Sequence, residues 1–465
     1  MAKDEIVMLG NALDFIRLYI DLLDDSLKKV GGSLTKSQKA WFAFCLTAMI
    51  FTNTINWKAW ERWSGGKYSD SALSKMLRWS LIPWNLLLIA STKLIISRYN
   101  IKEGVLVIDD SDHQRSKNTT HIGYTHRIKD KKYEGYFNGQ NLIFLLLVTD
   151  RITFPVGFSF YEPDPALKEW KDKNQDLKKQ KVSKQARPVQ PAKNDKYPSK
   201  LEIALDLLRD FFKNHSSLKI KCVLADAFYG SADFVKKASE MHGGMQVISQ
   251  IRSNQLVRNK KGLLVEVEQH FANQDRTCRR ISIRGEKEEI IILCAQKLWV
   301  AAHEEKRMVI AIRYENQKDF RYIIASDMTW QYIDVIQAYT LRWLIEVFFQ
   351  DWKTYEAWSN LAKQQGIEGS SRCVILSLLL DHSFFLHEAQ RPCIENKLPL
   401  HTIGSLTESC RLQIIFNAIS SIFKSPKPEE AFETIKKSLE MTISLEKSEK
   451  HMSHRGFKGI FSDAA

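Results

Sequence analysis

The sequence is poor in cysteine, and the cysteines that it has form no motif. Seven cysteines are scattered singly along 465 residues, with no C-x-x-C pair and an odd total. This pattern argues against a disulfide framework and against a zinc ribbon. It fits a reducing cytoplasm, which is therefore the expected location.

Long apolar runs are also missing. Residues 1–20 include three acidic residues and lack a continuous apolar core, so no signal peptide is expected there. The longest apolar runs, 42–55 and 86–97, are too short to span a bilayer, and the second is interrupted by a lysine. The sequence therefore predicts no membrane association.

What the chain has in excess is positive charge. Lys and Arg total 68 against 54 for Asp and Glu, a formal net charge of +14, which favours an acidic polymer as partner. The 12 Trp, 14 Tyr and 24 Phe are partly core material, yet aromatics in a basic protein could also stack on unpaired bases. With 44% hydrophobic residues the chain can form a large core and two to four domains.

Hydrophobic periodicity divides the chain into regions. Apolar residues at three- and four-residue spacing predict helices over 6–30, 36–63 and 81–98, with Ser33 or Thr35 as a cap of the second. The expected regions are a helical N-terminal region (1–100) that binds DNA ends, the first part of an α/β core (101–251), a β-rich insertion (252–326), a second core part with a long helix (327–390), and a helical C-terminal region with a basic tail (391–465).

One short helix in the first region has two readings. It follows a loop, with Ser69 or Asp70 as its cap, and bears Lys75 and Arg78. It could read DNA, or it could be an ordinary element of a helical bundle.

Acidic residues end two of the predicted core strands. VLVIDD (105–110) is a β-branched run that ends in Asp109 and Asp110, and a polar loop is expected over 111–135. KIKCVLAD (219–226) ends in Asp226. The remaining core elements expected are strands at 141–150, 152–161 and 245–251 and a helix at 201–212. If the two strands that end in Asp are neighbours, Asp110 and Asp226 approach each other.

A lysine-rich tract punctuated by proline, residues 162–200, separates the two halves of this pattern. It has almost no apolar content, which predicts a flexible surface loop. Its role is a solvated linker or, more specifically, a contact with DNA phosphates.

A third acid lies on the apolar helix predicted over 338–358. At about 100° per residue, four polar side chains fall within about 60° of one another on that helix: Tyr339, Arg342, Glu346 and Lys353. Such a stripe can be an ordinary solvated face with an i, i+4 ion pair contributing about 0.3 to 0.5 kcal/mol. Because the rest of the helix is apolar, the stripe can also look into a cleft.

Three carboxylates brought together need cations. Each pair repels by about 4 kcal/mol at about 4 Å and an effective dielectric constant of about 20. All-oxygen ligation selects hard divalent ions, and two such ions about 4 Å apart can hold an attacking water and a leaving 3′ oxygen on opposite sides of a phosphodiester. On the same helical face as Glu346, the hydroxyl of Tyr339 and the positive charges of Arg342 and Lys353 suit the phosphates that flank the cut.

The spacing Tyr-x2-Arg-x3-Glu-x6-Lys in YTLRWLIEVFFQDWK (339–353) resembles the signature of the DDE transposases of the insertion-sequence-four superfamily, the bacterial cut-and-paste group. With Trp343 and Trp352 included, the match is especially similar to the transposon-five transposase. In that family, as here, acids follow hydrophobic strands and a β insertion precedes the glutamate helix. The resemblance therefore covers roughly residues 100–390.

The resemblance implies a ribonuclease H-like catalytic core, a mixed sheet flanked by helices. It implies that Asp110, Asp226 and Glu346 bind two Mg²⁺ or Mn²⁺ ions, and that Tyr339, Arg342 and Lys353 grip phosphates near the transposon end. DNA ends and target DNA are then the partners, with a homodimer in the paired-end complex. The setting is a bacterial cytoplasm, at the nucleoid when DNA is bound.

Which acid of the first strand is the ligand stays open. Asp109 and Asp110 point to opposite faces of a strand, so only one of them can be a ligand. The family pattern, an acid followed by the catalytic Asp and then Ser or Thr, favours Asp110, and Asp112 is a further candidate that we assign to the loop.

Other candidates are weaker. Relatives that open a hairpin stack an aromatic of the insertion on a flipped base, and Trp299, Phe320 and Tyr322 are candidates for this role, although an aromatic in a strand is more often core. His113, His121 and His126 lack the spacing of a helical metal pair, so no zinc site is assigned.

The function expected is a DNA transposase that cuts at terminal inverted repeats and joins the 3′-OH ends to target DNA. Two alternatives remain: a domesticated DNA-binding protein that no longer transposes, and a metal-dependent nuclease on the same fold.

Overall fold

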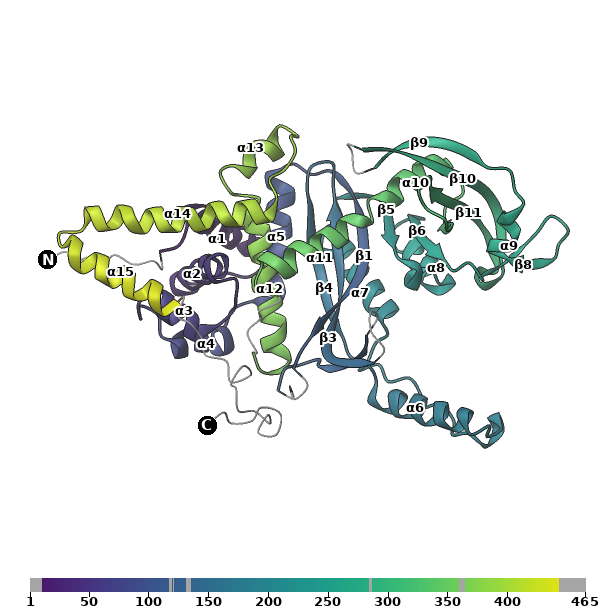
Figure 1. Cartoon of the computed structure of the whole chain (residues 1–465), viewed down its shortest axis with the longest axis horizontal. Helices are drawn as coiled ribbons and strands as arrows, with labels where there is room; N and C mark the ends of the chain where they lie inside the picture. Colours follow the sequence, from purple (N-terminus) through teal and green to yellow (C-terminus); the bar gives the residue numbers. More distant parts are fainter. Residues whose placement is uncertain are drawn as a thin grey trace, which may run out of the picture.

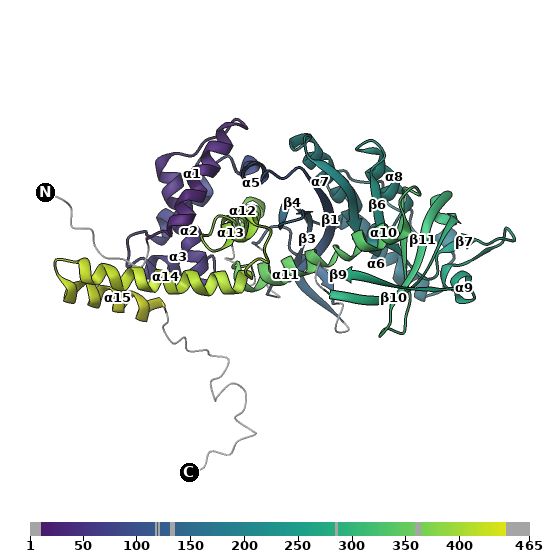
Figure 2. The same cartoon turned by 90° about the horizontal axis from the view of Figure 1, so that it is seen from above.

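The computed structural model describes residues 11–116, 119, 121–130, 135–283, 287–358 and 364–442. Two expected features, the start of the first helix (6–10) and the basic tail (443–465), lie outside the described residues. The molecule is elongated, with N-terminal helices at one end, a large sheet in the middle and the β-rich insertion at the other end (Figures 1 and 2).

The N-terminal region is helical, as expected, but the predicted second helix is broken. Asn53 has a left-handed backbone (φ 47°) and ends one helix, and the side chain of Asn56 accepts a hydrogen bond from the backbone of Ala59 to start the next. Thr35 and Ser69 are the capping residues observed. The helices are α1 (Asp14–Lys28), α2 (Lys36–Thr52), α3 (Trp57–Trp63), α4 (Asp70–Trp79) and α5 (Trp84–Arg98).

The centre of the molecule is a mixed sheet. Its strands are β1 (Glu103–Gln114), β2 (His126–Lys129), β3 (Tyr136–Val148), β4 (Thr153–Tyr161), β5 (Lys219–Ala225) and β6 (Gln246–Ile251). β1, β3 and β4 form an antiparallel meander, and β5 and β6 continue the sheet parallel to β1. β1 runs four residues beyond the predicted strand because Ser111 to Gln114 stay paired with β3.

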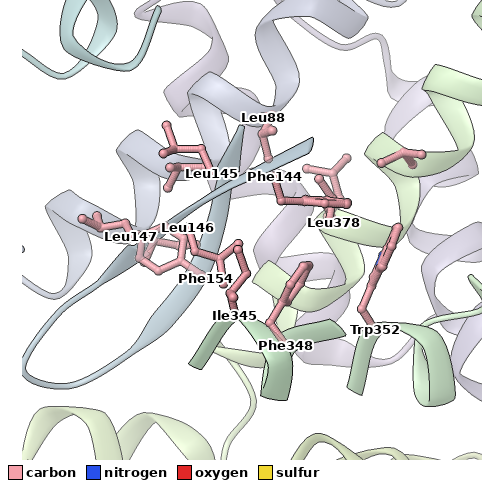
Figure 3. Packing of buried hydrophobic residues seen from close by; sticks show 14 of the residues in the cluster. Leu88, Phe144, Leu145, Leu146, Leu147, Phe154, Ile345, Phe348, Trp352 and Leu378 are labelled. Carbon is pink, nitrogen blue, oxygen red and sulfur yellow. The ribbon is translucent and has the colours of Figure 1, made fainter. Parts of the chain in front are cut away.

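Helices cover both faces of this sheet. On one face, Leu207 of α7 (Lys200–Asn214) lies against Gly157 of β4, and α8 (Ala232–Glu240) follows β5. On the other face, Phe144 of β3 packs against Phe348 and Trp352 of α11 (Trp343–Tyr355), next to Leu378 of α12 (Gly366–Phe384) (Figure 3). The expected fold class is confirmed: a mixed sheet flanked by helices, consistent with a ribonuclease H-like fold.

The insertion is mostly β, as predicted, and it extends the central sheet. Its elements are β7 (Leu256–Arg258), β8 (Leu264–Glu266), α9 (Val267–Ala272), β9 (Thr277–Ile283), β10 (Lys287–Val300), β11 (Glu305–Tyr314) and β12 (Arg321–Ala325). β12 pairs with β6, so the insertion adds strands to the core sheet while a separate apolar cluster fills its distal part.

The C-terminal region is helical, again as predicted. After α12 come α13 (Gln390–Glu395), α14 (Ile403–Lys424) and α15 (Pro428–Thr442). Buried residues of these helices belong to the same apolar cluster as the N-terminal helices and the sheet. Among the described residues no single helix is long and apolar enough to cross a membrane, although α4 and α5 together, bent by 89°, pass on length and composition alone.

The tract of residues 162–200 differs from the predicted loop. It contains a helix, α6 (Pro165–Lys179), that has no buried residue and extends away from the body of the molecule (Figure 1). The Asp164 side chain caps its N-terminus, and at its other end Val182 donates to Leu177 past Lys181, whose backbone is left-handed. End caps make a helix from a stretch whose composition predicts a loop.

A buried carboxyl pair lies where α11 ends against α12. Glu356 and Asp381 are almost fully buried, and their carboxyl groups interact with each other. Burial raises the pKa of Glu356 well above its usual range, and the charge of Asp381 adds to the rise. Burial also raises the pKa of Asp381 to about 7. Both groups therefore hold protons more tightly in the folded state than in the unfolded state.

We expect Glu356→Gln to stabilise the protein at alkaline pH. A carboxyl whose pKa is raised on folding contributes stability below its unfolded pKa and loses it as the pH rises through the folded pKa. The variant should therefore melt close to wild type near pH 5 and be more stable near pH 8, by on the order of 1 kcal/mol. Thermal melts across this range test the effect. The control is Glu388→Gln, an exposed glutamate, which should show no such trend.

Candidate active site

Strand pairing brings two of the expected acids together. β1 and β5 are parallel neighbours with Ile108 opposite Ala225, so Asp109 and Asp226 are the next residues along their strands and lie side by side on one face. The backbone of Asp226 is extended, and its carboxylate accepts a hydrogen bond of 2.9 Å from the backbone of Phe228. The two acids therefore meet where β5 ends beside the middle of β1.

The polar stripe predicted on the glutamate helix faces this end of the sheet. The helix is interrupted between α10 (Tyr332–Thr340) and α11, where backbone N–H groups bond three residues back, as from Arg342 to Tyr339. This tightened turn keeps the chain direction, and such turns often accompany functional sites. Phe144, opposite Asp109 in the β1–β3 register, packs under α11. The face that bears Asp109 is therefore the face that α11 covers.

Arg342 joins the third acid to the first. Its Nη1 atom lies 2.9 Å from Oδ2 of Asp109 and 3.7 Å from Oε1 of Glu346. The oxygens of these two carboxylates thus lie around one nitrogen atom, close to Asp226. We call Asp109, Asp226 and Glu346 the acid cluster.

The electrostatics of the acid cluster are unfavourable for a full set of charges. Burial and, after it, the negative charge of Asp226 raise the pKa of Asp109 to about 7, although the backbone N–H of Asp110 and the charge of Arg342 act in the opposite direction. Carboxylates crowded in this way are the ligands that a hard divalent cation prefers. Within the described ranges no three acidic, histidine or cysteine side chains form a ready-made metal site, and the guanidinium of Arg342 lies between two of these acids.

Asp110 lies on the other face of β1, under α7. Its Oδ2 atom accepts hydrogen bonds of 2.8 Å from Lys200 at the start of α7 and of 2.8 Å from Asn141 of β3. Asn141 also donates to Asp112, so the two acids share one amide. The structure therefore places Asp109, not Asp110, beside Asp226 and Arg342. Neither Lys200 nor Asn141 was a candidate from the sequence, since only the fold brings them to β1.

The two remaining residues of the stripe also reach the sheet. The Tyr339 hydroxyl donates to the carbonyl of Ala225 at 3.5 Å, one residue before Asp226. Burial raises the pKa of Tyr339, which therefore keeps its proton. Lys353 donates to the carbonyl of Asp112 at 3.1 Å, at the far end of β1. Arg342 and Lys353 thus reach the carboxyl-terminal half of β1, Tyr339 reaches the end of β5, and Glu346 lies beside Arg342.

A cavity of about 810 Å³ adjoins the acid cluster, between the insertion and the α10–α11 turn. Arg313, Arg321, Tyr339, Arg342 and Trp343 are among its lining residues. The Trp343 side chain is 45% exposed, although helical periodicity predicts a mostly buried helix. Glu288, Glu289 and Glu315 also line it, so the cavity combines arginine and glutamate side chains with an accessible aromatic ring.

The aromatic candidates from the insertion do not line this cavity. Tyr322 is buried in the core of the insertion. The other two rings have arginine side chains over them: Arg258 over Trp299, and Arg276 and Arg313 over Phe320.

The three histidines lie in different environments. Burial lowers the pKa of His113 to about 3, and its ring contacts Trp358. His126 contacts Tyr161, and His121 is exposed.

Comparison with known families agrees with the fold and with part of the site. A family model described as DDE superfamily endonuclease matches residues 65–288. The matched range includes β1 and β5, with Asp109, Asp110 and Asp226, and ends before α11 and Glu346. A comparison with curated proteins finds no match. DDE-type endonuclease domains generally use divalent metal ions, and their substrate is DNA. The match therefore supports a DDE transposase-type family, and a transposase- or nuclease-type function, for this chain.

Proposed function

We propose that this protein is the transposase of a bacterial insertion sequence, which cuts DNA at terminal inverted repeats and joins the 3′-OH ends to target DNA. The observation that supports this most strongly is the acid cluster, in which β1, the end of β5 and α11, from distant parts of the chain, present carboxylates to one place. A protein that only bound DNA would gain nothing from holding these acids together in a buried place, where burial and the charge of Asp226 raise the pKa of Asp109.

The acid cluster is proposed to hold two Mg²⁺ or Mn²⁺ ions, with Asp109 in the place that the sequence pattern assigned to Asp110. Bound ions of this kind lower the pKa of an attacking water and neutralise the charge of the leaving oxygen. Asp226 and Glu346 complete the set. Asp110 is proposed to have a structural role, because its hydrogen bonds to Lys200 and Asn141 lie on the opposite face of β1.

Tyr339, Arg342 and Lys353 are proposed to bind the phosphates on either side of the cut. Arg342 and Lys353 contact β1, Tyr339 contacts the end of β5, and Tyr339 and Arg342 also line the cavity. Each of the three offers a hydroxyl or a cation. In the structure the Arg342 guanidinium is paired with Asp109. Once bound metal ions neutralise Asp109, the guanidinium would turn to a phosphate instead. Trp343, exposed in the same cavity, offers a ring on which an unpaired base can stack.

The partners proposed are the element's DNA ends, the target DNA and a second copy of the chain, one copy for each end. The proposed setting is the bacterial cytoplasm, at the nucleoid when DNA is bound.

The proposal is tested by strand transfer. The purified protein is given a short duplex, taken from the DNA that flanks its gene and cut in advance to a 3′-OH end, together with a supercoiled plasmid and Mg²⁺. We expect plasmid molecules joined to the duplex, and none when EDTA or Glu346→Gln is used.

Three results separate the candidate functions. Joined products support a transposase. Metal-dependent nicking without joining supports a nuclease. Binding without either reaction would overturn the enzymatic proposal and leave a DNA-binding protein.

A further inference from the structure

The α6 helix is an arm that the core does not require. None of its residues is buried, and it reaches out from the sheet by about 22 Å at about 1.5 Å per residue (Figure 1). Trp170 connects the helix to the chain that returns from it, since its indole N–H donates to the carbonyl of Pro188 at 2.8 Å. Caps at both ends keep it helical without core packing.

The arm emerges at the catalytic end of the sheet. β4 runs parallel to β1, on the other side of β3, so the arm leaves the sheet at Tyr161, the end of β4 nearest to the carboxyl end of β1. It returns at Lys200, whose ammonium lies over the ring of Tyr161 and bonds Asp110 at 2.8 Å. Both roots of the arm are therefore fixed beside the strand that carries Asp109.

Charge on the arm is uneven. Residues 162–200 hold eleven Lys and Arg against six Asp and Glu, a surplus of five out of the net +14 of the whole chain. On the helical wheel Lys168, Lys171 and Lys178 share one face, and all three are exposed. The acids Glu169, Asp172 and Asp176 lie directly beside this face, next to Lys168 and to Lys179, which forms an ion pair of 3.4 Å with Asp176. The basic face is about 15 Å long, which matches a few successive phosphates of one DNA strand.

We infer that the basic face of α6 binds the phosphate backbone of the duplex that occupies the acid cluster, several base pairs from the cut. This inference rests on the proposed function for the identity of the DNA. It adds a second contact region, separate from Tyr339, Arg342 and Lys353, and independent of base sequence because lysines there meet phosphates only.

The test compares two triple variants. One replaces Lys168, Lys171 and Lys178 by glutamine. The other replaces Lys424, Lys436 and Lys437, exposed lysines of α14 and α15 at the opposite end of the molecule, and removes the same charge. Binding of a fluorescent duplex is measured by anisotropy at several salt concentrations. We expect the arm variant to reduce the slope of log K against log salt by about two to three units, at about 0.9 per phosphate, and the control to leave it unchanged.

Two single-residue variants compare the two sides of α6. Lys171→Gln should reduce the slope by about one unit, whereas Lys173→Gln, on the opposite side of α6, should not. Helicity and melting temperature should match wild type in every variant, because all of these lysines are exposed.

The outcomes separate this inference from the proposed function. Suppose that wild type nicks or joins DNA, and that the salt slopes of the two triple variants are equal, either unchanged from wild type or reduced by the same amount. The inference about α6 is then overturned, and the enzymatic proposal stands. If the arm variant alone loses slope while no cleavage occurs, the arm stands and the enzymatic proposal fails. Absence of any DNA binding by wild type overturns both.

Discussion

Asp109→Asn is expected to lower the rate of Mg²⁺-dependent nicking by about 10³-fold or more, equivalent to about 4 kcal/mol of transition-state stabilisation. The reason is the position of Asp109 beside Asp226 and, through Arg342, beside Glu346. An amide in that place keeps the shape of the side chain and loses the charge that a divalent ion requires. Single-turnover nicking of a labelled duplex measures the effect.

Asp110→Asn is the matched control, because it makes the same chemical change one residue away on the opposite face of β1. Its cost is the ion pair with Lys200, and we expect nicking to fall by no more than about tenfold. A reversed order, with Asp110→Asn inactive and Asp109→Asn active, would restore the assignment favoured by the family pattern. Equal activity of both variants would remove β1 from the chemistry.

Metal binding gives this comparison a readout that does not depend on activity. At pH 8, Mn²⁺ should raise the melting temperature of wild type and of Asp110→Asn, since an ion that binds only the folded state stabilises it by mass action. The same additions should have little effect on Asp109→Asn. A rise of equal size in all three proteins would place the bound ions elsewhere.

Local patterns in the sequence predict the parts of the site that are local. The intervals between Tyr339, Arg342, Glu346 and Lys353 suffice to place them on one helical face. In the structure Arg342 and Lys353 contact β1, Tyr339 contacts the end of β5, and Glu346 lies beside Arg342. Likewise, hydrophobic runs that stop at acids predict strands that carry Asp109, Asp110 and Asp226, although β1 continues beyond its acids to Gln114. These properties follow from periodicities of 3.6 and 2 residues.

The choice between Asp109 and Asp110 lies beyond such patterns. It depends on which face of β1 the helix α11 covers, and that is decided by Phe144, which pairs with Asp109 across the sheet and packs on Phe348. A shift of one residue in register would exchange the faces. The strand also continues through Ser111 to Gln114, polar residues that read as a loop, because β3 is long enough to pair with them.

Composition misled the prediction for the tract that holds α6. A segment with almost no apolar residues gains too little from burial to offset the conformational entropy that it loses on folding, so it is predicted to stay disordered. Here the capping side chain of Asp164, the left-handed Lys181 and the hydrogen bond from Trp170 order fifteen residues without burying any of them. In the same way, Asn53 and Asn56 split a continuous apolar pattern into α2 and α3.

Trp352→Ala is expected to destabilise the protein by about 3 to 5 kcal/mol, the largest stability effect of the substitutions considered. Trp352 is fully buried at the point where α11 meets both the sheet and α12. Its ring lies 4.8 Å from that of Phe144 and 4.3 Å from that of Trp358, and its indole N–H donates to Ser377 at 2.9 Å. Alanine would leave a cavity, and the Ser377 hydroxyl would keep only its hydrogen bond to the Val374 carbonyl. Denaturant unfolding measures the loss.

The same substitution tests how the glutamate helix is held in place. Val347→Ala, on the exposed side of α11, should cost less than about 1 kcal/mol and leave nicking unchanged. Trp352→Phe keeps most of the ring volume but loses the bond to Ser377, so it should fall between the two in stability. If nicking at a temperature where all three proteins are folded decreases in the same order, the seat formed by Phe144, Trp352 and Trp358 positions Glu346. If Trp352→Ala is folded and fully active, the position of Glu346 must instead depend on Arg342, whose Nη1 atom lies between Glu346 and Asp109.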